Sequence, residues 1–156
     1  MQKLVLCDNG NYTQTAALSR RYHASINTDA FYLPESEDAD PDEIKRCPDA
    51  YDGLPLCAMH GTFADLCFGS ADALIADATR RRFEYAYQTA QKLKVRHIVL
   101  HHGYVPGVSH PPNWLRRGKV FREQFLADKP DDTVFCIENL LEDTPGIDWQ
   151  HGGSSQ

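Results

Sequence analysis

The sequence predicts a parallel α/β fold of about five βα units. Short apolar runs of strand length alternate along the chain with longer segments of helical period, and this alternation is typical of parallel sheets. The composition is that of a globular domain, with 42% apolar and 24% charged residues in a chain of 156. This length suits one domain with a core of its own.

Five short apolar runs are the predicted strands, and they span residues 4–7, 25–32, 56–60, 97–101 and 133–138. The second run is the weakest because Asn27, Thr28 and Asp29 are polar. Three of these runs contain a cysteine, at Cys7, Cys57 and Cys136. Cysteine in a strand behaves as a small apolar residue, so we expect these three in the core.

Four segments between the strands are predicted helices. The first spans 12–22, and the second begins at Asp40-Pro41, where Asp caps and Pro occupies the first turn, and ends near residue 52. The third has apolar residues at the 3.6-residue period over 83–93, with Thr79 as its expected cap. The fourth places Trp114, Phe121 and Phe125 on one face, although Gly118 weakens it.

Composition excludes several classes of protein. The net charge of −6 disfavours general nucleic-acid binding, and the run Arg80 to Arg82 is more often a solvated helix face than a basic patch. No apolar run approaches the ~20 residues of a membrane span, and no cleavage site follows the N-terminus, so we expect a cytoplasmic protein. The five cysteines form no CxxC pair, which argues against disulfides and against a cysteine zinc site.

Three successive predicted strands end in potential metal ligands, namely His60, His101-His102 and Glu138-Asn139. In a parallel barrel the carboxyl ends of the strands meet at one mouth. Two imidazoles and a carboxylate converging there suit Zn²⁺ or Mn²⁺. A single histidine at a strand end is more often a polar residue near the surface, so the pattern alone leaves both interpretations open.

These strand ends carry a resemblance to a known family. The run HGTFADL from His60 to Leu66, LHHG from Leu100 to Gly103 and IEN from Ile137 to Asn139 are similar in order and spacing to the xylose isomerase-like TIM barrels, the superfamily of endonuclease IV and the sugar phosphate isomerases and epimerases. The resemblance covers roughly Leu4 to Pro145. Length alone favours a doubly wound sheet, but these motifs favour an incomplete (β/α)8 TIM barrel.

The resemblance implies roles for matching positions. In the endonuclease IV branch, positions like His60, His101 and Glu138 are zinc ligands. In the isomerase and epimerase branch, the position of Glu138 holds one divalent metal and moves a proton beside the substrate carbonyl, and the histidines contact the substrate.

Three further residues are candidates for substrate contact. Asp65 and Tyr104 lie in the predicted mouth loops, although loop hydrogen bonding is the simpler role for each. His102 stands where the family has proline. Because successive strand residues point to opposite faces, we expect His102 to face away from the mouth and favour a structural role over substrate contact.

The last residues lack the family's pattern, which continues through strands six to eight with further ligands. We therefore expect a partial TIM-barrel domain over 1–145 and an unrelated, disordered tail over 146–156, as in a truncated gene. Such a chain alone would bind Zn²⁺ or Mn²⁺ weakly or not at all and would have no turnover. Its open barrel edges would favour self-association.

The sequence thus predicts a divalent-metal-dependent sugar or sugar phosphate isomerase or epimerase, inactive alone if truncated. One alternative is an endonuclease IV-like nuclease acting on abasic sites in DNA, which the acidic charge disfavours. Another is a non-catalytic fragment, or a subunit completed by a second chain. Whether the chain is an enzyme stays open at this point.

Overall fold

The computed structural model describes residues 4–8, 11–33, 42–105, 110–138 and 148–149. In chain order the elements are β1 (Val5–Asp8), α1 (Tyr12–Tyr22), β2 (Ser25–Thr28), α3 (Glu43–Tyr51), β3 (Leu56–His60), α4 (Ala73–Leu93), β4 (His97–His101), β5 (Tyr104–Val105), α5 (Pro111–Leu126), β6 (Val134–Glu138) and β7 (Asp148–Trp149).

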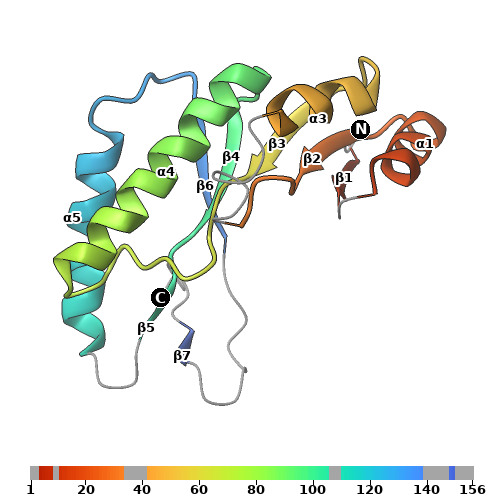
Figure 1. Ribbon diagram of the computed structural model, residues 1–156. Helices are drawn as coiled ribbons and strands as arrows, with labels where there is room; N and C mark the ends of the chain where they lie inside the picture. The colour runs from red at the N-terminus through yellow and green to blue at the C-terminus, as the bar shows by residue number, and fades with distance from the viewer. Residues whose placement is uncertain (1–3, 9–10, 34–41, 106–109, 139–147, 150–156) are drawn as a thin grey trace.

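Five strands form one parallel sheet in the order β1-β2-β3-β4-β6, so each strand lies beside the next one along the chain (Figure 1). Right-handed crossovers between strands in sequential order place all the helices on one face of the sheet. A doubly wound sheet instead reverses its order and carries helices on both faces. The predicted parallel fold of five βα units, equivalent to part of a barrel, is confirmed.

The two remaining strands form a separate antiparallel pair. Tyr104 of β5 pairs with Trp149 of β7, and Val105 pairs with Asp148. Asp148 and Trp149 are the described part of the segment 146–156, for which the sequence predicted a disordered tail.

The core lies between the sheet and the helices, and aromatic side chains fill the space where α4 and α5 meet. Phe83 packs edge-on against Phe121 and Phe125, with ring centroids 5.9 and 5.8 Å apart. Gly118 of α5 is buried here, and a Cβ at this position would lie 2.6 Å from the Phe68 ring. Gly118 therefore leaves room for the Phe68 ring, and this packing offsets the low helix propensity of glycine.

The third predicted helix begins earlier than the sequence indicated. Asp72 is the N-cap of α4, and its side chain accepts a hydrogen bond of 2.8 Å from the Leu74 amide. The prediction of Thr79 as the cap is wrong. Thr79 is buried in the helix, where its hydroxyl donates to the Ile75 carbonyl at 2.8 Å and accepts from the Cys67 amide at 3.0 Å. The apolar period over 83–93 marks only the half of α4 that faces the core.

Two other predicted boundaries differ in part from the structure. The second strand ends at Thr28 rather than continuing to residue 32, so Asp29 follows the strand. Helix α3 ends at Tyr51, as expected, with Asp52 in a left-handed conformation. The expected start of that helix at Asp40 and Pro41 lies outside the described residues.

The strands present two unlike faces. In β4, Ile98 and Leu100 are buried against the helices, whereas His97 is exposed and Val99 and His101 are half-buried. The prediction of three core cysteines is wrong in part: Cys7 is exposed, Cys57 and Cys136 are only half-buried, and all three are free thiols. The helix-free face accounts for Cys7 and Cys136. In the part of the chain that the structure describes, no helix covers the face on which Cys7 and Cys136 lie.

Two of the three adjacent arginines make contacts at the surface of α4. Arg81 forms a 2.8 Å ion pair with Asp77 one turn earlier, and the Arg80 guanidinium lies over the Phe121 ring at 4.8 Å. These contacts are typical of a solvated helix face rather than of a basic groove. Among the described helices, none combines the length and the apolar character that crossing a membrane requires.

Candidate metal centre

The carboxyl ends of β3, β4 and β6 bring three side chains together. Glu138 pairs with His101 across the β4–β6 ladder. One oxygen of Glu138, Oε2, lies 2.8 Å from His60 Nε2 and 3.1 Å from His101 Nε2. The convergence of these three residues, expected from their places at strand ends, is found in the structure.

The donor atoms of this group suit a divalent cation. One ligand atom from each of His60, His101 and Glu138 lies within 4.8 Å of the others. Two imidazole nitrogens and a carboxylate oxygen are a donor set that zinc and manganese accept. Three protein ligands leave an open position for water or substrate, as catalytic zinc sites do. These three residues therefore fit the metal that the resemblance implies.

Asp29, just after β2, holds the other side of the His60 ring. His60 Nδ1 lies 2.7 Å from Asp29 Oδ1, and the amide Nδ2 of Asn27 donates to the same oxygen at 3.0 Å. Histidines that ligate metals commonly donate their second N–H to a carboxylate, which fixes the ring and its tautomer. Sequence reasoning missed Asp29, although the polar run at the end of the second predicted strand was its signal.

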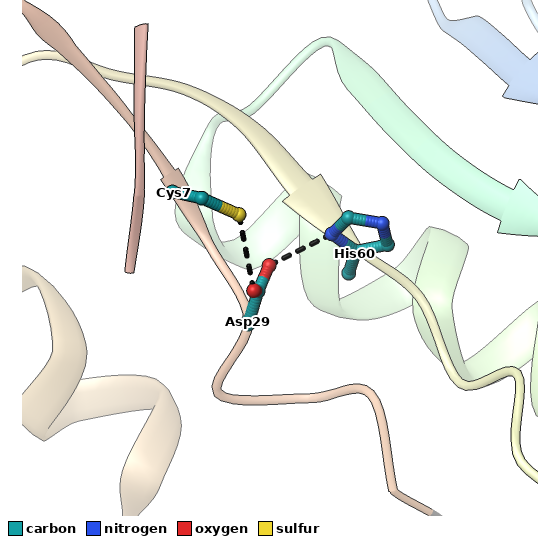
Figure 2. A group of neighbouring side chains, drawn as sticks. All are labelled: Cys7, Asp29 and His60. Atoms are coloured by element: carbon teal, nitrogen blue, oxygen red, sulfur yellow. Dashed lines mark hydrogen bonds and ion pairs between the residues drawn. The ribbon is translucent and has the colours of Figure 1, made fainter. Parts of the chain in front are cut away.

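Cys7 of β1 extends this arrangement across the sheet. Its thiol donates to Asp29 Oδ2 at 3.1 Å, so Asp29 lies between Cys7 and His60 (Figure 2). Cys7, Asp29 and His60 form a second group whose ligand atoms lie within 4.8 Å of one another. The two groups share His60, which presents Nε2 to one and Nδ1 to the other.

The surroundings shift the pKa values of His60, His101 and Glu138 in different ways. The hydrogen bond to Asp29 outweighs burial and, together with the bond to Glu138, raises the pKa of His60. Burial lowers the pKa of His101 more than the Glu138 charge raises it. Burial opposes ionisation of Glu138, but the two histidines together lower its pKa, so this residue is a carboxylate at neutral pH.

Aromatic rings form one side of the centre. The Phe63 ring stacks on the His101 imidazole with a centroid separation of 4.0 Å and an angle of 7° between the planes. Tyr32 stacks on Phe63 in turn at 5.3 Å. Phe63 therefore packs on the imidazole plane and restricts its rotation.

Two of the three predicted substrate residues, His102 and Asp65, have no described contact with the metal group. His102 is fully buried on the opposite face, beside the rings of Phe68 and Trp114, as strand alternation predicts. Asp65 is exposed in a loop with a positive φ of 60° and has no described hydrogen bond to the group. Tyr104 lies in β5, and its side chain is outside the described part of the structure.

The sequence matches no protein-family model and no curated protein. The structure does match solved structures, among them a D-tagatose 3-epimerase-like protein, with a TM-score of 0.72 and 16% identity over 94% of this chain. The chain has the fold of about half of this TIM-barrel protein, of which it covers 55%. The sequence-based recognition of this fold from the motifs at His60, His101 and Glu138 is confirmed.

Two further matches are also named as sugar epimerases. A 3-keto-D-glucoside 4-epimerase from E. coli has a TM-score of 0.61 and 14% identity over 89% of this chain. An L-ribulose 3-epimerase has a TM-score of 0.64 and 18% identity over 90% of this chain. The chain spans about half the length of these proteins, covering 55%, 57% and 50% of the three in the order given. At these identities the likeness shows the fold.

Proposed function

We propose that this chain carries the metal centre of a divalent-metal-dependent sugar or sugar phosphate isomerase or epimerase. The observation that carries the proposal is the meeting of His60 Nε2 and His101 Nε2 at one oxygen of Glu138. This meeting occurs at the strand ends where TIM barrels build their sites. Three structural matches with this fold are named as sugar epimerases or an epimerase-like protein.

The metal would be Zn²⁺ or Mn²⁺, held by His60, His101 and Glu138. A cation in this place supplies Lewis-acid polarisation of a substrate carbonyl. Asp29 keeps the His60 ring oriented through its 2.7 Å contact with Nδ1, and Phe63 supports the plane of His101. The protein thereby holds the donor atoms in place before substrate arrives.

Glu138 is the proposed base. Its carboxyl is ionised at neutral pH and its side chain is 46% exposed on the helix-free face, so a substrate can reach it. Glu138 would take the proton from the carbon beside the carbonyl, and the electron pair of that C–H bond would pass to the carbonyl oxygen as an enediolate. Return of the proton to the former carbonyl carbon, with the hydroxyl proton of the enediol passing to the other oxygen, would give an isomer. Protonation of the original carbon on its opposite face, by solvent or a second acid, would give an epimer.

Other residues have lesser proposed roles. Phe63 and the partly exposed Tyr32 would offer apolar ring surface to a sugar beside the centre. Asp65 and Tyr104 remain candidates for substrate contact through their loops. For His102 we propose a structural role, because its ring is buried among aromatic side chains on the other face. We expect the protein to act on cytoplasmic sugars.

Proton exchange tests this function directly, because it requires only one base. The chain with Mn²⁺ is incubated in D₂O with a panel of ketoses and their phosphates, and deuterium at the carbon beside the carbonyl is measured by NMR. We expect exchange with the wild-type chain and at least about 100-fold less with Glu138→Gln, the range of one acid–base group. The matched control Glu123→Gln, at an exposed position of α5, should exchange normally.

Two other results would contradict the proposal, and each would support one of the alternative functions. The same three residues are the zinc ligands that the resemblance implies for an abasic-site nuclease, so zinc-loaded protein should also be tested on an abasic duplex. Cleavage that depends on Glu138 would establish that alternative against the disfavouring charge of −6. Metal binding with neither exchange nor cleavage would identify a non-catalytic chain, or a subunit that a second chain completes.

A further inference from the structure

The strongest arrangement outside the proposed centre is the group on the far side of His60. Cys7 Sγ, the Asp29 carboxylate and His60 Nδ1 each contribute one ligand atom, and these atoms lie within 4.8 Å of one another (Figure 2). They come from three successive parts of the sheet, namely β1, the end of β2 and the end of β3. The parallel pairing of those strands places them side by side.

We propose that this group is a second metal site for a zinc-like cation, distinct from the centre at Glu138. Its ligands are Cys7 Sγ, one oxygen of Asp29 and His60 Nδ1. The fourth ligand is the side-chain oxygen of Asn27. The site goes beyond the proposed function, because neither proton transfer nor the first cation requires it.

Asn27 lies beside these three residues and is the candidate for the fourth ligand. Its residue is 8% exposed, and its side-chain oxygen is buried with no hydrogen-bond partner among the described residues. Its amide nitrogen lies at the centre of the group, 3.2 Å from Cys7 Sγ, 3.0 Å from Asp29 Oδ1 and 3.2 Å from His60 Nδ1. Leaving a buried polar atom unpaired costs about 1–3 kcal/mol.

A half-turn of the Asn27 amide would turn its oxygen toward the group. The turn exchanges the nitrogen and oxygen positions, which have nearly the same shape. The oxygen would then face Cys7, Asp29 and His60, where a cation accepts it. Four protein donors of S, O, N and O type complete the tetrahedral shell that zinc prefers.

The donor set also selects the metal. A thiolate and an imidazole favour zinc-like ions over hard ions such as Mg²⁺ and Ca²⁺, which take oxygen ligands. The first centre has no sulfur donor, so Mn²⁺ suits it better than it suits the second. The contacts of 3.1 Å from Cys7 to Asp29 and 2.7 Å from Asp29 to His60 are hydrogen bonds. A cation would replace their protons.

Proton balance follows from the ligand atoms. On binding, Cys7 loses its S–H proton and His60 loses its Nδ1 proton, and both pass to solvent. Asp29 then binds the cation instead of accepting these two hydrogen bonds. When both sites are filled, the His60 ring bridges them as an imidazolate, with Nε2 in the first site and Nδ1 in the second.

Cobalt is the probe, because a thiolate bound to Co²⁺ gives a charge-transfer absorption in the near ultraviolet that imidazole and carboxylate ligands do not give. The reduced full chain is titrated with Co²⁺, and both this absorption and the number of ions bound are measured. We expect the absorption to reach its maximum when the second site holds one Co²⁺. The chain should bind two ions in total. The Cys7→Ser chain should lose the absorption and bind one ion.

Control variants separate this site from the proposed function. Cys57→Ser, at a half-buried cysteine of a neighbouring part of the sheet, should keep the absorption. Glu138→Gln should keep it too and lose one ion, whereas an unchanged ion count in Glu138→Gln would contradict the first centre alone. Asp29→Asn should weaken cobalt binding to the thiolate at least tenfold, which tests the site without altering Cys7. Absorption that persists in Cys7→Ser, or that is absent from the wild-type chain, would overturn the second site.

Discussion

His60 lies between two carboxylates, and this position determines how the residue behaves. Asp29 faces Nδ1 at 2.7 Å and Glu138 faces Nε2 at 2.8 Å, so both ring nitrogens donate only when the imidazole is protonated. The pKa of His60 is raised for this reason. A cation at Nε2 must displace a proton, so affinity at the first centre should increase as pH rises through the pKa of His60.

The Asp29→Asn variant tests the hydrogen bond on which this argument depends. In protein without added metal, NMR titration of the His60 ring should give a lower pKa in the variant than in the wild type. The bond also contributes to folding stability. Because the folded pKa of His60 is raised, that contribution is complete below the ordinary histidine value of about 6.5 and is lost as pH rises through the folded pKa.

Asp29→Asn should therefore destabilise the protein by about 1–2 kcal/mol near pH 6 and by less near pH 9, measured by urea unfolding at both pH values. Asp49→Asn, at an exposed position of α3, is the matched control and should show no such difference. An unchanged His60 titration in Asp29→Asn would show that Asp29 does not control the ring.

At this scale the sequence identified His60, His101 and Glu138 because each ends an apolar run in a parallel fold. It did not identify Asp29 or Cys7. The polar residues before Asp29 weakened the prediction of the second strand, and Cys7 was assigned to the core as a small apolar residue. Both errors have one cause, which is that a barrel strand has an inner face where polar side chains belong, and a single strand does not reveal which face is inner.

At the contact between α4 and α5, tertiary packing favours a glycine in α5 although glycine has a low helix propensity. Gly118 lowers the propensity of α5 by about 1 kcal/mol relative to alanine. The structure shows the compensation, since the Phe68 ring occupies the space of the missing Cβ. That ring stacks on Phe121 at 5.9 Å and lies 5.5 Å from Trp114, so it has little room to move.

Gly118→Ala should therefore destabilise the protein, although it improves helix propensity. Overpacking costs about 1–3 kcal/mol, which exceeds the gain of about 1 kcal/mol from propensity. We expect a net loss of up to about 2 kcal/mol in the free energy of unfolding, measured with urea. Arg116→Ala, at an exposed position of the same helix, should change stability by less than about 0.5 kcal/mol. A more stable Gly118→Ala chain would contradict the packing argument.

On the scale of the whole molecule, the sheet has two outer strands. Within the described residues, β1 pairs only with β2, and β6 pairs only with β4. Length favoured a doubly wound sheet, but the sequential strand order resolves the choice in favour of a barrel segment. The sequence could predict this only through the resemblance of the strand-end motifs to TIM-barrel proteins, because a doubly wound sheet also gathers the carboxyl ends of its strands at one edge.

Outer strands with unpaired backbone groups favour association between copies of the chain. Val134 of β6 is 42% exposed, and a charge there should oppose pairing of this edge. Val134→Lys should weaken self-association at least about tenfold, or 1.4 kcal/mol, as measured by analytical ultracentrifugation. Val120→Lys, equally exposed at 43% but on α5, is the control and should associate like the wild type. A wild-type chain that is monomeric at all concentrations would refute this prediction.

The central claim is that His60, His101 and Glu138 form one metal centre, and calorimetric titration with Mn²⁺ tests it most directly. Mn²⁺ is the appropriate ion because the thiolate-containing second site should not retain it. We predict one Mn²⁺ per wild-type chain and the same for Glu123→Gln. Glu138→Gln and His101→Ala should each lose more affinity than the 10–100-fold that an outer contact costs. Wild-type affinity in both of these variants would contradict the claim.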